Sequence, residues 1–293
     1  MGFIGFGEAA FNICDGLHET SKPEVFAFDV MSNDEKQGAL IQQRARKANV
    51  ALLDSLKCLI EKTEFIFCTT SAKYALSIAS EAAQYTKAGK TYADLNSASP
   101  MVKKDIADVI DRSGGAFVDA AVMELVPPYR HKVPIAASGS GARRFTEAMN
   151  SIGMNVEYIN DCAGSSSSMK MFRSIFMKGF TSLLLETLIA SHKMGVENQV
   201  MESIKGTLEK NTTEELANML INRTAVAAAR RVSEMEDVVT TLADIKVESF
   251  SSQATIKRLQ WICDIGLKEY FEGKVPQHYS SVLEAVSKIM QTQ

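Results

Sequence analysis

Small residues with the spacing G-x-G-x-x-A, at Gly5, Gly7 and Ala10, follow the first apolar run of the chain. In a strand, turn and helix unit, the first glycine allows a tight turn and the second lets a pyrophosphate approach the backbone. The small third residue allows close packing of helix and strand. Free amide groups and the positive end of the helix dipole bind phosphate without a basic side chain. The pattern predicts dinucleotide binding, and a tight turn alone is the alternative.

A carboxylate at Asp29 ends the second apolar run, about 20 residues beyond the glycines, where an acidic side chain can accept hydrogen bonds from the adenosine ribose hydroxyls. This carboxylate would repel the extra phosphate of NADP. Val30, Met31 and Ser32 bring no cation to offset that repulsion. We therefore expect NAD rather than NADP, and the alternative interpretation of Asp29 is a turn residue without a ligand.

Three polar residues spaced four apart, Lys170, Ser174 and Lys178, follow a glycine and serine stretch. This spacing places them on one face of a helix. A lysine beside a nicotinamide can give a proton to a carbonyl oxygen as hydride arrives, and can take it back in the oxidative direction. We expect Lys170 to do this, Ser174 to orient the same oxygen and Lys178 to bind substrate. The alternative is a solvated helix surface.

Asn96, Ser97 and Ser99 follow an apolar run over residues 91–95. If that run is a parallel strand, these residues lie at its carboxyl end, the edge where open α/β sheets bind ligands. We predict that Asn96 contacts the cofactor and that Ser97 takes part in catalysis. Capping of the helix that Pro100 begins is an equally physical role for Ser97 or Ser99.

Further residues complete the predicted site. The cofactor contacts also include Glu8, Ala9, Thr69, Thr70 and Ser71, and the substrate contacts include Met123, Arg130 and His131. An arginine can pair bidentately with a carboxylate or phosphate, although a plain surface loop explains Arg130 and His131 equally well. The four histidines lack H-x-H or H-E-x-x-H spacing, so we expect no catalytic metal.

Runs of strand length alternate with helical patterns up to about residue 160, which is typical of crossover units and a parallel sheet. The predicted strands are residues 2–6, 25–29, 64–69, 91–95, 116–122, 134–138 and 156–159. Apolar residues at three- and four-residue spacing predict helices over 8–19, 72–85, 99–111 and 142–152.

After residue 164 the pattern becomes helical throughout. It predicts one long helix over 165–194, followed by helices at 200–209, 213–221, 224–239, 248–270 and 280–290. The apolar part of the long helix is interrupted by Lys178, Gly179 and Glu186, and so falls short of the roughly 18 to 20 clean residues of a membrane span. We expect a buried helix there.

The predicted fold class is α/β, a doubly wound parallel sheet followed by an all-α domain. The expected domains are 1–162 and 163–293, joined by the long helix. With 293 residues, 46% hydrophobic and 23% charged, the composition is that of a globular protein rather than a disordered one. A net charge of −3 leaves no basic excess for nucleic acid. Five cysteines without C-x-x-C spacing and an opening without a secretion signal favour the cytoplasm.

Several motifs resemble the β-hydroxyacid dehydrogenase superfamily, which includes 3-hydroxyisobutyrate and 6-phosphogluconate dehydrogenases. They are the opening GFIGFGEAA, DLNSASP from Asp94, VDAAVM from Val118 and the lysine after the serine stretch. VPPYRHKVP from Val126 and ARRVSEMEDV from Ala229 resemble the phosphogluconate dehydrogenase-like branch whose C-terminal domain has no known function. The resemblance implies a Rossmann domain, a helical domain that builds a homodimer, and a lysine acid/base matching Lys170.

Two departures from the superfamily concern the substrate. Ser174 stands where the superfamily commonly has asparagine, and a serine reaches less far than an amide. The segment DAAVMEL from Asp119 replaces the usual D-A-P-V-S-G-G, whose backbone amides hold a substrate carboxylate. An acid substrate is therefore not assured.

The sequence as a whole predicts an NAD-dependent oxidoreductase that moves hydride between nicotinamide and a small hydroxylated or carbonyl compound. A β-hydroxyacid is one candidate, and decarboxylation after oxidation stays open. Imine reduction is an alternative, against which Lys170 argues. A non-catalytic dinucleotide sensor is another, which Ser174 keeps open. We expect no membrane partner.

Overall fold

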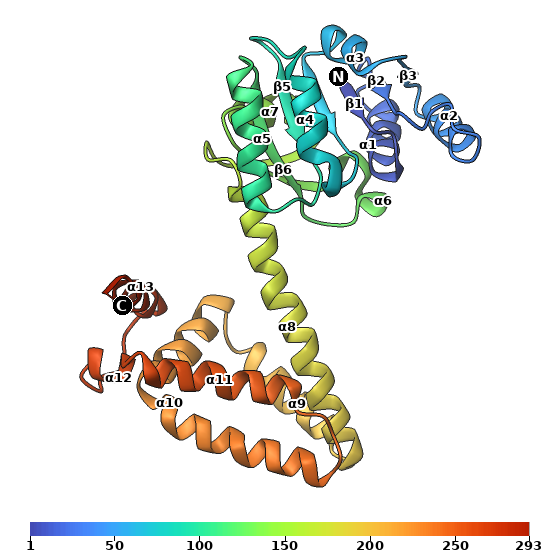
Figure 1. The fold of residues 1–293 in the computed structure, drawn as a ribbon. Helices are drawn as coiled ribbons and strands as arrows, with labels where there is room; N and C mark the ends of the chain where they lie inside the picture. The colour runs from blue at the N-terminus through green and yellow to red at the C-terminus, as the bar shows by residue number, and fades with distance from the viewer. Residues whose placement is uncertain (293) are drawn as a thin grey trace. The chain divides into compact units, whose positions relative to one another are not determined.

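A computed structural model describes residues 1–292 of the chain, which divide into two compact units. The first unit is Met1–Arg173 and the second begins at Ser174. The division falls inside one continuous helix, α8 (Ser165–Lys193), so this helix contributes residues to both units (Figure 1).

An eight-stranded sheet forms the first unit, with the strand order β3-β2-β1-β4-β5-β6-β7-β8 (Figure 1). The strands are β1 (Gly2–Ile4), β2 (Phe26–Phe28), β3 (Ala51–Leu52), β4 (Phe65–Cys68), β5 (Thr91–Asp94), β6 (Ala116–Val122), β7 (Pro134–Ser138) and β8 (Asn155–Asn160). All neighbours pair in parallel except β6 and β7. The predicted α/β class and the all-helical region that follows it are confirmed.

Two apolar layers cover the sheet, because alternate residues of a strand face opposite sides. Phe3 and Phe67 lie in the layer under helices α1 (Glu8–Glu19), α2 (Gly38–Lys47) and α7 (Ala142–Ser151). Ile4 and Ile66, the next residue and the preceding one in their strands, lie in the opposite layer under α3 (Leu56–Lys62), α4 (Ala75–Ala83) and α5 (Pro100–Arg112). The sheet is therefore wound on both faces.

The antiparallel pairing of β6 with β7 corrects the expectation of a wholly parallel sheet. Only α6 (Val126–Tyr129) and the 3₁₀ turn η2 (Arg130–Lys132) separate these strands. A parallel return needs a crossover of about a dozen residues or more, usually a full helix. Because this connection is too short for that, β7 runs back beside β6, and β8 then follows parallel to β7.

Residues 30–63 hold three elements that the sequence did not predict, which are α2, β3 and α3. Strand β3 has two residues, and only Gly38, Ile41 and Ala45 of α2 are buried. A strand of two residues and a helix with so few apolar positions give almost no periodic signal. The 3₁₀ turn η1 (Ala72–Tyr74) precedes α4 where one helix was expected.

The second unit is helical, with α9 (Glu197–Leu208), α10 (Thr213–Asp244), α11 (Phe250–Asp264), α12 (Leu267–Tyr270) and α13 (Tyr279–Thr292) after α8 (Figure 1). Two helices expected at 213–221 and 224–239 are the single α10, with a kink at Ala227 (φ −118°, ψ 18°). The helix expected over 248–270 is broken at Gly266, whose φ of +71° lies in the left-handed region. A left-handed residue ends a helix, and glycine adopts it without strain.

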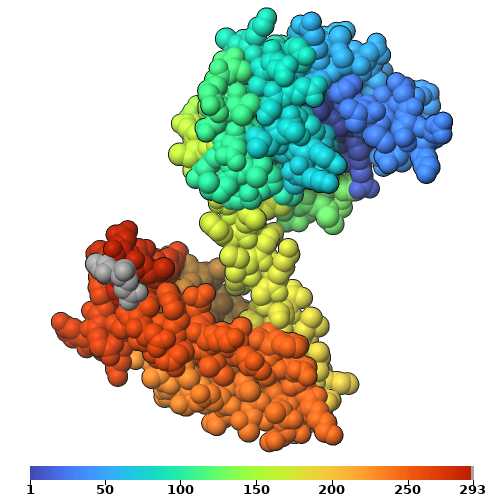
Figure 2. All heavy atoms as spheres, in the orientation of Figure 1, coloured from blue at the N-terminus to red at the C-terminus, as the bar shows by residue number. Residues whose placement is uncertain are grey.

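Helix α8 is exposed where the sequence predicted burial. By length and composition it is the one helix of residues 1–292 that could cross a membrane, and 6% of its most apolar stretch is buried. Exposed apolar side chains include Phe172, Ile175, Phe176, Leu185 and Ile189. The expectation of a buried helix is therefore wrong for the single chain. The space-filling view of Figure 2 shows α8 in yellow.

Gly164 sets the start of α8. Its φ is +88°, and an added Cβ would lie 2.8 Å from the carbonyl oxygen of Pro100. We expect Gly164→Ala to lower the free energy of unfolding by about 2 kcal/mol or more, from left-handed strain and the backbone clash. Gly179→Ala is the control, because nothing lies within 4 Å of its added Cβ, and alanine should stabilise a helix interior by about 0.5–1 kcal/mol. Equilibrium denaturation measures both, and equal stability of the two variants would contradict the expectation.

Candidate functional site

The glycine turn after β1 fits a phosphate ligand. Gly5 has φ +83°, and a Cβ there would lie 2.7 Å from Cγ2 of Thr70, so both conformation and space require glycine. Gly7 is exposed at the N-cap of α1, and nothing lies within 4 Å of the point where its Cβ would be. A ligand can therefore approach the backbone at a helix N-terminus, which attracts anions. Ala10 is fully buried in the core.

Asp29 is tied to this turn from the end of β2. One carboxylate oxygen accepts a hydrogen bond from the amide of Phe6 at 2.7 Å, and the other accepts one from Met31 at 2.8 Å. A cavity of about 470 Å³ adjoins it, lined by Phe28, Asp29, Val30, Ser32, Asn33, Gln42, Leu52, Leu53 and Asp54. Two carboxylates and no basic side chain occur among these lining residues. The lining therefore carries negative charge without a compensating cation.

A second cavity of about 440 Å³ lies at the carboxyl ends of β4, β5 and β6. It is lined by Glu8, Ala9, Thr69, Thr70, Ala72, Leu95, Asn96, Ser97, Val122, Glu124, Leu125, Val126, Pro127 and Lys170. Seven of the predicted site residues meet here, from segments far apart in the chain: Glu8, Ala9, Thr69, Thr70, Asn96, Ser97 and Lys170. This cavity, which we call the lysine cavity, is the candidate reaction site.

Lys170 and Ser97 contact each other in the lysine cavity. The amine of Lys170 donates a hydrogen bond to Oγ of Ser97 at 3.3 Å. Ser99 instead caps α5, since its hydroxyl accepts a hydrogen bond from the amide of Val102 at 3.3 Å. Ser99 therefore has the capping role, and the catalytic role of Ser97 stays a prediction.

The pKa of Lys170 is lowered from its ordinary value. The main cause is burial, which penalises the charged amine, and the second is repulsion from the ammonium of Lys103. Lys170 is half-buried near the start of α8, within the first unit. A lysine with a lowered pKa exchanges protons more readily near neutral pH, which suits an acid/base.

Asn96 is buried between two strands and held firmly. Its amide nitrogen donates hydrogen bonds to Asp94 at 2.5 Å and to Sγ of Cys68 at 3.3 Å. Burial and the nearby Asp94 raise the pKa of the Cys68 thiol, which removes it as a nucleophile. Asn96 therefore presents a fixed wall to the lysine cavity.

The end of β6 and the segment after it form a wall of the lysine cavity in which the sequence predicted only Met123. Val122, Leu125, Val126 and Pro127 line it with apolar groups, and Glu124 accepts a hydrogen bond from Arg173 at 3.4 Å. Met123, which was predicted to bind substrate, is not among the lining residues. The departure DAAVMEL marked this segment in the sequence, but alternation along the strand alone did not show which residues face the cavity.

Arg130 and His131 contact helix α1. The guanidinium of Arg130 pairs with Asp15 at 2.5 Å and with Glu19 at 2.6 Å, both on α1. His131 is buried, and a Cβ on Gly16 would lie 2.3 Å from its ring. Burial, with the charges of Lys132 and Arg130, lowers the pKa of His131. Neither residue lines the lysine cavity, because α1 occupies the guanidinium and packs on the ring, so the structure does not supply the expected anion anchor.

The remaining predicted residues lie outside the lysine cavity's lining. Ser71 caps η1 by accepting a hydrogen bond from the amide of Lys73 at 3.4 Å, and its neighbour Ala72 lines the cavity instead. Ser174 and Lys178 lie one and two turns beyond Lys170 on α8, within the second unit, and their roles stay predictions. Across residues 1–292, no group of three or more His, Cys, Asp or Glu side chains could hold a metal.

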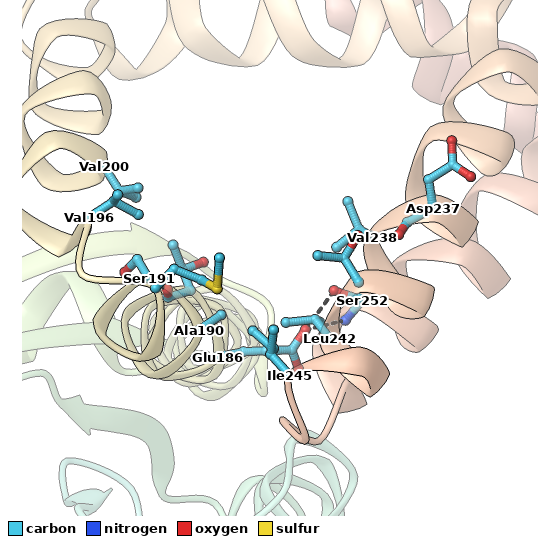
Figure 3. A pocket seen from close by; sticks show the side chains of 13 residues that line it. Glu186, Ala190, Ser191, Val196, Val200, Asp237, Val238, Leu242, Ile245 and Ser252 are labelled. Atoms are coloured by element: carbon cyan, nitrogen blue, oxygen red, sulfur yellow. Dashed lines mark hydrogen bonds between the residues drawn. The ribbon is translucent and has the colours of Figure 1, made fainter.

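A third cavity, also about 440 Å³, lies within the helical unit and contains none of the predicted residues. It is lined by Glu186, Thr187, Ala190, Ser191, Met194, Val196, Val200, Asp237, Val238, Thr241, Leu242, Ile245 and Ser252 (Figure 3). Glu186 is occupied, since its carboxylate accepts hydrogen bonds from the amides of Ser251 and Ser252 at the start of α11. The rest of the lining is mostly apolar.

Comparisons with known proteins agree with this architecture. Residues 191–262 match the family described as domain of unknown function DUF1932. A conserved hypothetical protein from Sinorhizobium meliloti 1021 is 30% identical, with 98% of this chain and 95% of that chain covered and a TM-score of 0.66. A conserved protein of unknown function, described as structurally similar to 3-hydroxyacid dehydrogenases, is 29% identical over 90% of this chain and 96% of that chain, with a TM-score of 0.63.

An imine reductase from Aspergillus terreus, in complex with NADPH4 and dibenz[c,e]azepine, shares the fold at a TM-score of 0.71. It is 14% identical, with 92% of this chain and 98% of that chain covered. Fold and site together define a Rossmann-type protein with a helical C-terminal domain. The chain belongs to the β-hydroxyacid dehydrogenase superfamily, in the branch that carries the DUF1932 domain.

Proposed function

We propose that this protein is an NAD-dependent oxidoreductase that transfers hydride between nicotinamide and a small hydroxylated or carbonyl compound. The observation that carries the proposal is the amine of Lys170, half-buried and 3.3 Å from the hydroxyl of Ser97 in the lysine cavity. Thr69 and Thr70 pack on the glycine turn and also line this cavity, so the turn and the amine belong to one site.

Different residues of the chain bind the dinucleotide and transfer the proton. Gly5 and Gly7 expose the backbone that would hold the pyrophosphate, and Asp29 would accept the ribose hydroxyls. The nicotinamide of a bound dinucleotide supplies or accepts the hydride. Lys170 gives a proton to the substrate oxygen during reduction and removes it during oxidation, while Ser97 fixes the amine and hydrogen-bonds the same oxygen.

The choice of NAD over NADP rests on this chain's residues. The Aspergillus terreus relative is in complex with NADPH4. Here Asp29 and Asp54 both line the cavity at the end of β2, and a 2′-phosphate placed among them would meet two like charges without a lysine or arginine in the lining.

Imine reduction is the second candidate. It is favoured by the charge of the lysine cavity, where Glu8 and Glu124 outnumber the single lining cation, Lys170, and the remaining wall is largely apolar. Such a wall accepts a neutral carbonyl or a cationic iminium more readily than a carboxylate. An assay of NADH oxidation with a panel of carbonyl compounds and cyclic imines distinguishes the two candidates.

Loss of the amine tests the catalytic role. We expect wild-type protein to oxidise NADH with at least one member of a panel of aldehydes, ketones, keto acids and cyclic imines. Lys170→Met should lower kcat about 10²–10⁴-fold, the usual contribution of acid/base catalysis, with little change in NADH affinity. Stopped-flow absorbance and fluorescence titration measure the two effects.

Lys104→Met is the matched control, since Lys104 is an exposed lysine on α5. Unaltered kcat in Lys170→Met would remove the proposed role. Tight NADH binding with no turnover across the panel would instead identify a dinucleotide sensor.

Cofactor choice is tested at Asp29. We expect NADH to bind at least about tenfold more tightly than NADPH, equivalent to about 1.4 kcal/mol. Asp29→Ser should shrink this ratio by weakening NADH and relieving the repulsion of NADPH, whereas Glu35→Gln, an exposed acid outside the cavity lining, should preserve it. Equal affinities of the wild type for the two nucleotides, measured by fluorescence titration, would refute the preference.

We also propose that the protein is a homodimer through its helical unit and works in the cytoplasm. Exposed apolar side chains along α8 and the apolar cavity of Figure 3 give the helical unit two uncovered apolar surfaces, which typically mark protein interfaces. A second copy would cover both by symmetry. All five cysteines are free thiols, which supports a reducing compartment.

A charge on α8 tests the dimer. Phe176 is 63% exposed and stacks on Phe180, so Phe176→Asp alters an exposed apolar surface rather than a core. We expect sedimentation equilibrium to give a dimer for wild type and for Lys104→Asp, and a dimer constant weakened at least tenfold for Phe176→Asp. A monomeric wild type, or flotation with lipid vesicles, would overturn the proposal.

A further inference from the structure

Lys103 is a fully buried lysine beside the lysine cavity but outside its lining. It lies on α5, and its side chain is 0% exposed. Its ammonium lies 2.9 Å from a carboxylate oxygen of Asp94 and 3.3 Å from one of Asp119, and it donates a hydrogen bond to the backbone oxygen of Asp94 at 2.6 Å. Both carboxylates are also 0% exposed. We call these three residues the buried ion cluster.

Each carboxylate of the buried ion cluster holds one side of the proposed reaction site. Asp94 accepts hydrogen bonds from the backbone amide of Asn96 at 3.2 Å and from its side chain at 2.5 Å, directly before Ser97. Asp119 accepts hydrogen bonds from the amide of Ser167 at 2.8 Å and from its hydroxyl at 2.6 Å, one turn before Lys170. The ammonium of Lys103 lies between these two connections.

We infer that Lys103 is a positioning residue, which holds the Asn96–Ser97 loop and the first turn of α8 together so that the amine of Lys170 meets the hydroxyl of Ser97. This inference rests on the proposed function only for the acid/base role of Lys170. Without the ammonium, two carboxylates would face each other in the core, which is strongly unfavourable. The distance between the Asn96–Ser97 loop and the first turn of α8 would then change.

The same ammonium acts on Lys170 electrostatically. Repulsion from Lys103 is the second cause, after burial, of the lowered pKa of Lys170. The other charged groups around the amine come from several elements: Glu8 on α1, Asp94 on β5, Asp119 on β6 and Glu124 after β6. When Lys103 is removed, the repulsion disappears whether the two aspartates stay ionised or one takes up a proton. The pKa of Lys170 should therefore rise.

The experiment measures the Lys170 amine without requiring a substrate. Full-length protein is treated with trace acetic anhydride over a series of pH values, and acetylation at each lysine is followed by peptide mass spectrometry. In wild type, the midpoint of Lys170 should lie below the ordinary value of a lysine. Lys103→Met should move the Lys170 midpoint upward, so that acetylation at pH 8 slows about three- to tenfold, which corresponds to roughly 0.5–1 pKa unit. Lys104→Met should leave the Lys170 curve unchanged.

Lys103→Met/Asp119→Asn is the second variant, because neutral replacement of a buried ion pair is often tolerated where removal of one partner is not. An upward shift is expected in it too, but a smaller one, because the Asp119 carboxylate that favours the ammonium form of Lys170 is removed with Lys103. A folded Lys103→Met variant whose Lys170 curve matches wild type overturns the inference, as does a wild type in which the Lys170 midpoint is not lowered. Where a turnover assay exists, kcat should fall with KM and NADH affinity retained. An inactive wild type that shows the shift would leave Lys103 in its role and remove only the proposed function.

Discussion

A buried ammonium between two buried carboxylates determines the arrangement of the sheet's carboxyl edge. A charge removed from water must be paired, and here the pairing joins α5, β5 and β6 at one point. The carboxylates use their remaining oxygens on the backbone of the loop after β5 and of the first turn of α8. The polar network therefore fixes the loop that carries Ser97 and the helix turn that leads to Lys170, and the site is built on both.

Backbone geometry positions the glycine turn, as the buried ion cluster positions the amine of Lys170. Gly5 brings the turn against the end of β4, and Asp29 fastens the same turn to the end of β2 through the amide of Phe6. Three adjacent strands thus present a glycine turn, a carboxylate and a pair of threonines at one edge. The two cavities at that edge differ in character, since the one beside Asp29 has two carboxylates and no cation in its lining, whereas the lysine cavity has an amine and an apolar wall beside its two carboxylates.

Sequence patterns predicted the elements with strong periodicity and the residues with specific chemistry. The strands at 116–122 and 134–138 and the helix at 8–19 agree with the structure to the residue, and Lys170 does lie beside Ser97. Lys103 could not be predicted, because a lysine next to Lys104 in a charged helix resembles any solvated lysine until the fold buries it. Likewise, no local signal shows that Arg130 pairs with α1, which requires contacts across more than 100 residues of sequence. The antiparallel β7 depends on a short connection that contains its own small helix.

The division of the chain within α8 has a consequence for its synthesis. The first 173 residues form a compact unit with its own apolar layers. This unit contains the strands of the sheet, the glycine turn, the buried ion cluster and Lys170. A nascent chain can therefore complete this unit while the later helices are still being translated, since domains generally fold as units from the N-terminus. The apolar stretch of α8 emerges directly afterwards, and because completion of its own unit leaves it exposed, it is a segment to which a chaperone can bind.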